Sequence, residues 1–317
     1  MAAHAKLFCS VIIPTIGRDT LARAVSSALD QAPVAEQVEV IVVNDSGRPL
    51  PPAEWQQSPR VSIITTQRRE RSVARNVGAA LARGTFLCFV DDDDWLLPDA
   101  LAHFQRLVAA RPDAVWLYGG IQIIGADGKC VAEANSGLNG PCLAQIMGGA
   151  WVPLQSSLIP EAVFFKVGGF NPAIRGTEDQ DLCRRIVALG SLANIDTAVA
   201  CLYRGDFWQT STDYGRAAED TRLSRDEVVD QPGSFRQMMS SAETTYWYGR
   251  VCHIYVSLAL WHWRQQRPFT AFSRTLYALA AFIPALPHLL THDFWHAFRA
   301  EHPPGTLHFI QKQLETE

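Results

Sequence analysis

The fold is decided by one stretch of the sequence, Phe86-Leu87-Cys88-Phe89-Val90-Asp91-Asp92-Asp93-Asp94, which Trp95-Leu96-Leu97-Pro98 follows. An apolar run of strand length thus ends in four adjacent carboxylates. Such acids repel one another, and desolvating any of them is costly. The cluster therefore calls for a counter-charge, which a divalent metal carrying a phosphorylated ligand would supply. A solvated acidic turn is the alternative, but the apolar flank and the helix start expected at Pro98 argue against it.

The composition indicates a globular protein. Of the 317 residues, 48% are hydrophobic and 19% are charged, which allows an ample core in one large domain or two smaller ones. The net charge is 28 − 32 = −4, so the chain has no electrostatic footprint for nonspecific nucleic-acid binding.

The cysteines indicate a reducing compartment. Their number is odd, none form a CxxC pair, and several lie in apolar strand-like runs. We therefore expect buried thiols in a cytoplasmic protein, not a disulfide framework or a zinc site. The first apolar run, residues 11–13, meets Pro14 at once, so it fits a first strand better than a secretory signal.

Strands and helices alternate in the first hundred residues. Short apolar runs predict strands at residues 7–13, 38–43, 61–65 and 85–90, and periodic patterns predict helices from about residue 21 and over residues 70–83. This alternation is typical of a parallel sheet with helices on both sides. The loops at residues 14–18, 44–47 and 91–94 would then converge at the carboxyl ends of the strands, where such sheets bind nucleotides. Neither GxGxxG nor GxxxxGK[ST] occurs after these strands.

The helix over residues 70–83 is expected to face the core with Val73, Val77, Ala80 and Leu81. A different face would carry the arginines Arg68, Arg71 and Arg75.

The middle of the chain predicts further strands and one more helix. Strands are expected at residues 114–124, 151–159 and 192–203, with a hairpin turn at residues 126–128. A helix opening near residue 175 would bury Leu182, Ile186 and Leu189. Glu178 and Asp179 fall in its first turn, where acids can simply complement the helix dipole, an effect of about 0.3–1 kcal/mol.

The last third, residues 211–317, predicts a helical region that follows a catalytic domain over residues 1–210. Two amphipathic stripes stand out: Trp247, Val251, Ile254, Tyr255, Leu258 and Trp261, then Phe269, Phe272, Leu276, Leu279 and Ile283. These helices either pack on the main domain or on each other, or contact an acceptor or a membrane surface, because basic residues interleave with the aromatics. A spanning helix is not expected, since Arg274, Pro284 and Pro287 interrupt the longest apolar stretch.

Six motifs follow one another along the chain: Cys9–Thr15, Val40–Ser46, Ala74–Gly78, Gly84–Pro98, Val167–Asn171 and Thr177–Leu182. Together they resemble the family 2 glycosyltransferases of the GT-A fold over about residues 7–205. The resemblance implies an α/β protein with a Rossmann-like mixed sheet flanked by helices, to which the C-terminal helical region is appended. It also implies metal-assisted transfer from a nucleotide sugar, with inversion at the anomeric carbon.

The resemblance implies a nucleotide site at the first strands. Pro14 and Thr15 match the loop that lies against the base, and Asp45 matches the acid that accepts a hydrogen bond from the base. Arg75, with Arg71 beside it, matches a residue on the nucleotide side of the pocket.

The resemblance divides the remaining acids into two groups. Asp91 and Asp93 match the DxD signature, whose carboxylates hold Mn²⁺ or Mg²⁺ and contact the nucleotide, while Asp92 matches a ribose contact. Glu178 and Asp179 match the acidic pair over the acceptor site, with Asp179 as the general base. Such a base is required because an acceptor hydroxyl is a poor nucleophile until its proton is taken.

The chain departs from the family pattern at one place. Many relatives carry a histidine shortly after the last strand, whereas this chain has Tyr203-Arg204-Gly205-Asp206-Phe207-Trp208 and no histidine between His103 and His253. Either Asp206 or another loop residue replaces it, or the metal keeps extra water. Asp94 is expected to cap the turn into Pro98.

The leading hypothesis is an inverting glycosyltransferase that uses a nucleotide sugar, such as a UDP-sugar. Its acceptor would be a hydroxyl in surface polysaccharide, lipid-linked oligosaccharide or glycoconjugate assembly, and its location cytoplasmic, including the inner face of the plasma membrane. A nucleotidyltransferase on a similar sheet is the first alternative, although residues 14–18 are poor in the Gly, Arg and Lys expected of a loop that binds a triphosphate. A non-catalytic interaction module is the second.

Overall fold

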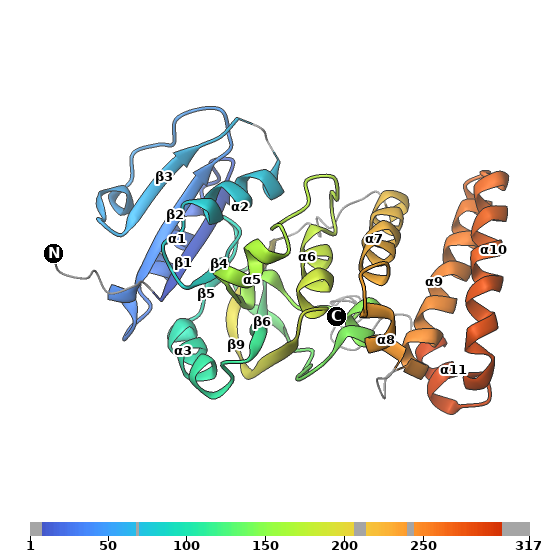
Figure 1. The fold of residues 1–317 in the computed structure, drawn as a ribbon. Helices are drawn as coiled ribbons and strands as arrows, with labels where there is room; N and C mark the ends of the chain where they lie inside the picture. The colour runs from blue at the N-terminus through green and yellow to red at the C-terminus, as the bar shows by residue number, and fades with distance from the viewer. Residues whose placement is uncertain (1–7, 68–69, 206–213, 240–243, 300–317) are drawn as a thin grey trace.

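The computed structural model describes residues 8–67, 70–205, 214–239 and 244–299. Figure 1 shows an elongated arrangement in which the first strands lie at one end and helices α9, α10 and α11 at the other. The sheet therefore occupies the first two thirds of the chain and a helical region the last third.

The amino-terminal half of the sheet is parallel, as the alternating pattern predicts. Its strands are β1 (Cys9–Thr15), β2 (Val38–Asn44), β3 (Val61–Thr65) and β4 (Phe86–Phe89), in the order β3-β2-β1-β4. All of β2 and nearly all of β1 are buried, because helices α1 (Leu21–Leu29) and α2 (Arg71–Ala80) pack on them. The expected helix from residue 21 is confirmed, and Leu21, Val25 and Ala28 are buried in it.

The sheet continues beyond β4 with both strand directions. The order is β4-β8-β6-β9-β5, with β8 (Ser157–Pro160), β6 (Ala114–Gly125), β9 (Ser191–Gly205) and β5 (Trp95–Leu96). β8 runs antiparallel to β4 and β6, whereas β6 and β9 are parallel. β7 (Cys130–Ala134) forms the expected hairpin with β6. The mixed sheet flanked by helices is therefore confirmed.

Helices and short turns connect these strands. The strand expected at residues 151–159 is correct only at its end, because a 3-10 turn precedes β8. The connecting helices are α3 (Ala100–Ala110), α4 (Leu143–Met147), α5 (Glu161–Lys166) and α6 (Glu178–Val187), with the 3-10 turns η1 (Ala35–Gln37), η2 (Glu54–Gln57) and η3 (Leu154–Ser156). In α6, Leu182 and Ile186 are buried as expected, but Leu189 lies beyond the helix and is exposed.

The carboxyl ends of β1, β2 and β4 meet at one edge. Thr15 lies opposite Asn44 in the register of β1 and β2, and the Asp45 N–H donates to the Thr15 carbonyl at 2.8 Å. On the other side of β1, the Val90 N–H donates to the Ile12 carbonyl at 3.0 Å. The loops at residues 44–47 and 91–94 therefore lie on either side of the loop at residues 14–18, at the carboxyl ends of the parallel strands.

The core face of α2 differs from the expected one. Leu81 is 48% exposed, and the buried residues are Ser72, Ala74, Arg75, Gly78 and Ala79. A Cβ built on Gly78 would lie 2.5 Å from Ile12 Cγ2, so the helix approaches the sheet too closely for a larger side chain. Small residues face the sheet for that reason, and the same turn of the helix carries Arg75 into the interior.

The last third of the described chain is helical. It comprises α7 (Tyr214–Val229), α8 (Ser234–Met239), α9 (Thr244–Arg264), α10 (Pro268–Ala285), the 3-10 turn η4 (Leu286–His288) and α11 (His292–Arg299). In α9, Trp247 and Leu258 are buried. In α10, the expected apolar stripe does not pack on the protein: alanines face α9 and the stripe is exposed. By length and composition alone, residues 268–288 could cross a membrane.

The close approach at Gly78 predicts an overpacking effect. We expect Gly78→Ala to lower the free energy of unfolding by about 1–3 kcal/mol, because the added methyl group meets Ile12 and Val43. This exceeds the gain of about 1 kcal/mol that alanine brings in a helix interior. Urea unfolding followed by circular dichroism measures the change. Ala80→Ser, on the exposed side of α2, is the control and should stay within about 0.5 kcal/mol. A Gly78→Ala protein as stable as the wild type would contradict the prediction.

Candidate active site

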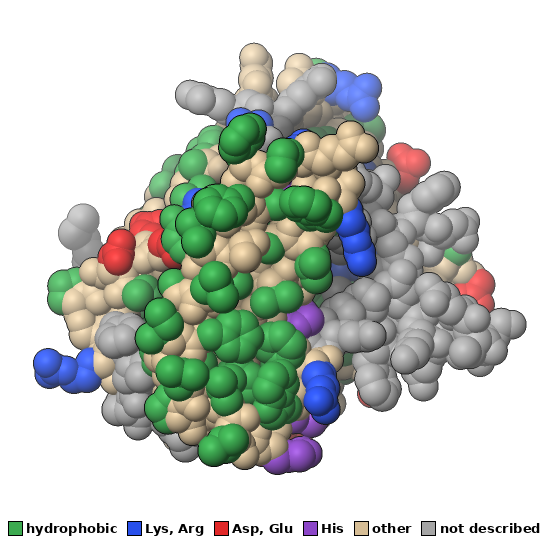
Figure 2. Space-filling view, turned by 90° about the vertical axis from the view of Figure 1, so that its right-hand side faces the viewer, with side chains coloured by type: hydrophobic (Ala, Val, Ile, Leu, Met, Phe, Trp, Pro, Cys, Tyr) green, Lys and Arg blue, Asp and Glu red, His purple; other side chains and the backbone are tan. Residues whose placement is uncertain are grey.

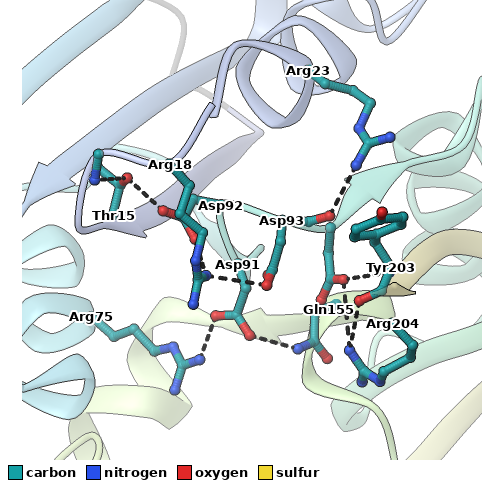
Figure 3. A network of polar contacts seen from close by, with 12 residues as sticks. Thr15, Arg18, Arg23, Arg75, Asp91, Asp92, Asp93, Gln155, Tyr203 and Arg204 are labelled. Carbon is teal, nitrogen blue, oxygen red and sulfur yellow. Dashed lines mark hydrogen bonds and ion pairs between the residues drawn. The ribbon is translucent and has the colours of Figure 1, made fainter. Parts of the chain in front are cut away.

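The four acids form the turn between β4 and β5, and they alternate in burial. Asp92 and Asp94 are 2% and 1% exposed, whereas the side chains of Asp91 and Asp93 are 28% and 32% exposed. Figure 3 shows the labelled acids Asp91, Asp92 and Asp93 among side chains from several elements. A solvated acidic turn does not describe this cluster, since two of its carboxylates lie in the interior.

Asp92 ties the acid run to the loop after β1. The Thr15 hydroxyl donates to Asp92 Oδ2 at 2.6 Å, and Arg18 Nη1 lies 2.5 Å from Asp92 Oδ1. Arg18 Nη1 also lies 3.1 Å from Asp93 Oδ2, so one guanidinium neutralises two neighbouring acids (Figure 3). Sequence reasoning did not single out Arg18, although its place in the loop after the first strand was a usable signal.

Asp91 is held between an arginine and an amide. Arg75 Nη2 lies 2.5 Å from Asp91 Oδ1, and Gln155 Nε2 donates to Asp91 Oδ2 at 2.8 Å (Figure 3). Burial opposes the ionisation of Asp91, but the charge of Arg75 outweighs it, and the pKa of Asp91 lies below its ordinary value. Gln155 comes from η3, about sixty residues further along the chain, and no local pattern predicts its contact with Asp91.

Arg75 also reaches the acidic pair at the start of α6. Its Nη1 lies 3.0 Å from Glu178 Oε1, and Arg71 Nε lies 2.6 Å from the same oxygen. The side chain of Arg75 is only 3% exposed, whereas that of Arg71 is 53% exposed. Burial lowers the pKa of Arg75, but the charges of Asp91 and Glu178 have the larger, opposite effect, so the pKa lies above its ordinary value. One buried guanidinium therefore joins the two acidic groups that the sequence sets nearly ninety residues apart.

Asp179 differs from its neighbour Glu178. In the described part of the chain it makes no ion pair, and its carboxylate accepts a hydrogen bond from the Gln180 N–H at 2.8 Å. Burial, and then the charge of Glu178, raise the pKa of Asp179, while Arg71 and Arg75 offset part of this effect. Glu178 is occupied by arginines, so Asp179 is the member of the pair whose carboxylate can take a proton.

Asp94 does not cap the turn into Pro98, and that expectation is wrong. Its Oδ1 accepts a hydrogen bond from the Tyr203 N–H of β9 at 2.9 Å and lies 4.0 Å from Arg204 Nη1. Its buried Oδ2 has no hydrogen-bond partner among the described residues. Burial, and then the charge of Asp91, raise the pKa of Asp94 well above its ordinary value. The backbone of β9 therefore holds this acid, because the Tyr203 N–H lies within hydrogen-bond distance of it.

One oxygen from each of Asp91, Asp93 and Asp94 lies within 4.8 Å of the others. Burial, and then the charge of Asp91, raise the pKa of Asp93. Clustered carboxylate oxygens, one of them buried without a partner, are the donors that Mg²⁺ and Mn²⁺ prefer. The residues thus fit a divalent cation, and Asp94 lies beside the two carboxylates that the resemblance implies as ligands.

The other expected nucleotide contacts lie at the same edge of the sheet. Asp45 follows β2, and its carboxylate accepts hydrogen bonds from the Thr66 hydroxyl at 2.8 Å and the Glu70 N–H at 2.6 Å. Pro14 lies half-buried in β1. Contact of either residue with a base stays a prediction. Asp206, the expected substitute for the missing histidine, lies outside the described residues.

Comparison with known proteins agrees with this geometry. Residues 10–130 match the family model described as Glycosyl transferase family 2. An uncharacterised glycosyltransferase of Haemophilus influenzae is 26% identical over 188 residues, which cover 56% of this chain and 61% of that protein. The succinoglycan biosynthesis protein ExoO of Rhizobium meliloti is 40% identical over 99 residues, or 30% of this chain and 27% of that protein. The chain thus spans less than two thirds of the length of either relative.

The solved structure of S. aureus TarS 1–349 in complex with UDP-GlcNAc has a similar fold. Its TM-score is 0.61 at 15% identity, and the match covers 95% of this chain and 99% of that one. The family match thus covers residues 10–130, and the similarity of fold extends over nearly the whole chain. Both findings agree with the resemblance to the family 2 glycosyltransferases of the GT-A fold that the six motifs carry.

The arginine bridge predicts unequal costs for two neighbouring arginines. We expect Arg75→Ala to lower the free energy of unfolding by about 3 kcal/mol or more, because it strips Asp91 of its arginine and leaves Glu178 with Arg71 alone. Arg71→Ala is the matched control and should cost less than about 1 kcal/mol, since Arg71 is half-exposed. Chemical unfolding measures both variants, and equal costs would contradict the bridging role.

Proposed function

We propose that the protein is a metal-dependent, inverting glycosyltransferase that moves a sugar from a nucleoside-diphosphate sugar, a UDP-sugar in the first instance, to an acceptor hydroxyl. The observation that carries the proposal is the division of carboxylates around Arg75. Asp91 and its neighbours cluster on one side of that guanidinium, and Glu178 with Asp179 lies on the other. Sugar transfer releases an anionic diphosphate and removes a proton from the acceptor. It therefore needs one acidic group that binds a cation and another that accepts the proton.

The donor would lie along the edge formed by β1, β2 and β4. Thr15 and Asp45 stand at the ends of β1 and β2, where the base and ribose are proposed to bind with Pro14 and Asp92. Arg71 is half-exposed on the same side, so its guanidinium is available to the diphosphate. TarS was solved with UDP-GlcNAc, which supports a UDP-sugar donor for this chain.

The metal would be Mn²⁺ or Mg²⁺, held by Asp91, Asp93 and Asp94. When bound, such a cation stabilises the charge that develops on the leaving diphosphate oxygen. Arg18 already neutralises Asp92 and part of Asp93, so the acid run is not left with its full charge when the donor departs.

Asp179 is the proposed general base. The acceptor oxygen attacks the anomeric carbon, the bond from that carbon to the diphosphate oxygen breaks with its electron pair, and the hydroxyl proton passes to the Asp179 carboxylate. A single displacement of this kind inverts the anomeric centre. Glu178 is a positioning residue in this scheme, because Arg71 and Arg75 occupy it and fix the first turn of α6.

The acceptor proposed is a hydroxyl in surface polysaccharide, lipid-linked oligosaccharide or glycoconjugate assembly. The match to a succinoglycan biosynthesis protein supports this class. We place the catalytic domain at residues 1–210 and an accessory helical region at residues 211–317, and we propose a cytoplasmic location. All seven cysteines are free thiols, which agrees with a reducing compartment.

Donor use and metal dependence can be tested together. With a panel of nucleotide sugars and Mn²⁺, we expect release of a nucleoside diphosphate from one donor, loss of release with a chelator, and recovery on adding metal. Asp93→Asn should lose the activity and the metal-induced rise in Tm that the wild type shows. Asp113→Asn, on the exposed surface, is the charge-matched control and should keep both. Turnover by Asp93→Asn at the wild-type rate, or release of pyrophosphate from a nucleoside triphosphate, would contradict the proposal.

The role of Asp179 predicts a rate and a pH effect. We expect Asp179→Asn to lower kcat by about 10²–10⁴-fold with donor binding retained. A base must be unprotonated, so kcat/KM of the wild type should fall as the pH drops through the raised pKa of Asp179. The residual activity of Asp179→Asn should lack this acidic limb, and its persistence in the variant would assign the titration to another group.

A further inference from the structure

The outer side of α10 carries a continuous apolar surface, which we call the α10 face. Its large side chains are spaced alternately by three and four residues, so they lie along one side of the helix and its continuation. Their exposed fractions run from 51% to 98%. The members are Phe269, Phe272, Leu276, Leu279, Ile283, Leu286 and Leu290. Figure 2, which views this end of the molecule, shows hydrophobic side chains gathered over it.

The opposite side of α10 explains why the α10 face stays open. Ala271, Ala278 and Ala285 are buried, and α10 packs with that side on α9. The charged residue of α10, Arg274, also points inward, where its guanidinium pairs with Glu219 of α7. The described chain thus covers one side of the helix only. Contiguous exposed apolar surfaces of this kind mark interaction sites in soluble proteins.

The segment that carries the α10 face is opposite in charge to the rest of the chain, although two of its arginines, Arg250 and Arg274, face inward. Residues 244–299 contain five arginines and a single acid, Asp293, which gives 5 − 1 = +4. The chain as a whole has a net charge of −4, so the remaining residues carry −8. Arg264 and Arg267, in the turn from α9 into α10, and Arg299 at the end of α11 are all exposed. A basic rim around an apolar surface complements an anionic lipid surface.

The sequence of α10 argues against a second helix as the occupant. The spacing of the α10 face equals that of the a and d positions of a coiled coil, whose e and g positions usually carry charges that set the pairing. Here the e and g positions are Ser273, Thr275, Ala280 and Phe282. A bilayer surface needs no such charges, so their absence favours lipid over a specific helical partner.

We infer that the α10 face docks on the surface of an anionic bilayer, with the helix lying in the plane of the interface. Residues 268–288 are long and apolar enough to cross a membrane by composition, but α9 runs along their other side and the Arg274–Glu219 pair lies there. Only one side can therefore meet lipid, which is the arrangement of an interfacial helix. The inference does not depend on the proposed transfer reaction.

Vesicle sedimentation of the full chain tests the inference. We expect binding to phosphatidylcholine vesicles that contain phosphatidylglycerol, and binding at least about tenfold weaker to phosphatidylcholine alone or at high salt. Replacing two members of the α10 face, Phe272→Glu with Leu279→Glu, should weaken binding at least about tenfold, because both side chains are exposed and would meet the acyl boundary.

The matched control is Leu223→Glu, an equally drastic change at a 49% exposed leucine of α7. It should bind vesicles like the wild type, and all variants should keep the wild-type Tm. Wild-type binding by the double variant, or sedimentation with neither kind of vesicle, would overturn the inference. Analytical ultracentrifugation tests a second copy of the chain as the alternative occupant. If the wild type forms a dimer, the double variant does not, and the wild type binds no vesicles, the α10 face is a dimer interface.

Discussion

The candidate site depends on the buried guanidinium of Arg75. It contacts Asp91 at the end of β4 and Glu178 at the start of α6, so it connects the parallel half of the sheet to the part that follows. An unpaired charge in this position would be costly, and so would either carboxylate without it. The same contact holds Glu178 in the first turn of α6, and with it the neighbouring Asp179. The close packing of α2 on β1 through Gly78 brings Arg75 to that depth.

The two ends of the molecule use charge in different ways. In the acid run, arginines from other elements neutralise the carboxylates: Arg18 serves Asp92 and Asp93, and Arg75 serves Asp91. In the helical region the single arginine within α10 is turned inward onto Glu219, and the members of the α10 face carry no charge. Figure 1 places these regions at opposite sides of an elongated chain, with α6 and α7 between them. The polar candidate site and the apolar α10 face therefore lie on separate parts of the molecular surface.

Local pattern predicted most of the strands, the loops at the edge of the sheet and the acid cluster after β4. It could do so because strand runs and acid clusters are properties of neighbouring residues. It failed where partners are distant in sequence. Gln155 reaches Asp91 and Tyr203 reaches Asp94 across the sheet, and no spacing signals either contact. The core face of α2 was misjudged because small residues, not large ones, permit close approach, and Leu81 is exposed as a result.

The alternating burial of the acid run has a consequence for its length. Asp92 is held by the loop after β1 and Asp94 by the backbone of β9, while Asp91 and Asp93 stay partly open between them. Inserting or deleting one residue would shift the phase of this alternation, so that an anchoring carboxylate would face the open side and an open one would be driven into the interior. We therefore expect the folded structure of this turn to be less sensitive to the replacement of one side chain than to the insertion or deletion of one residue.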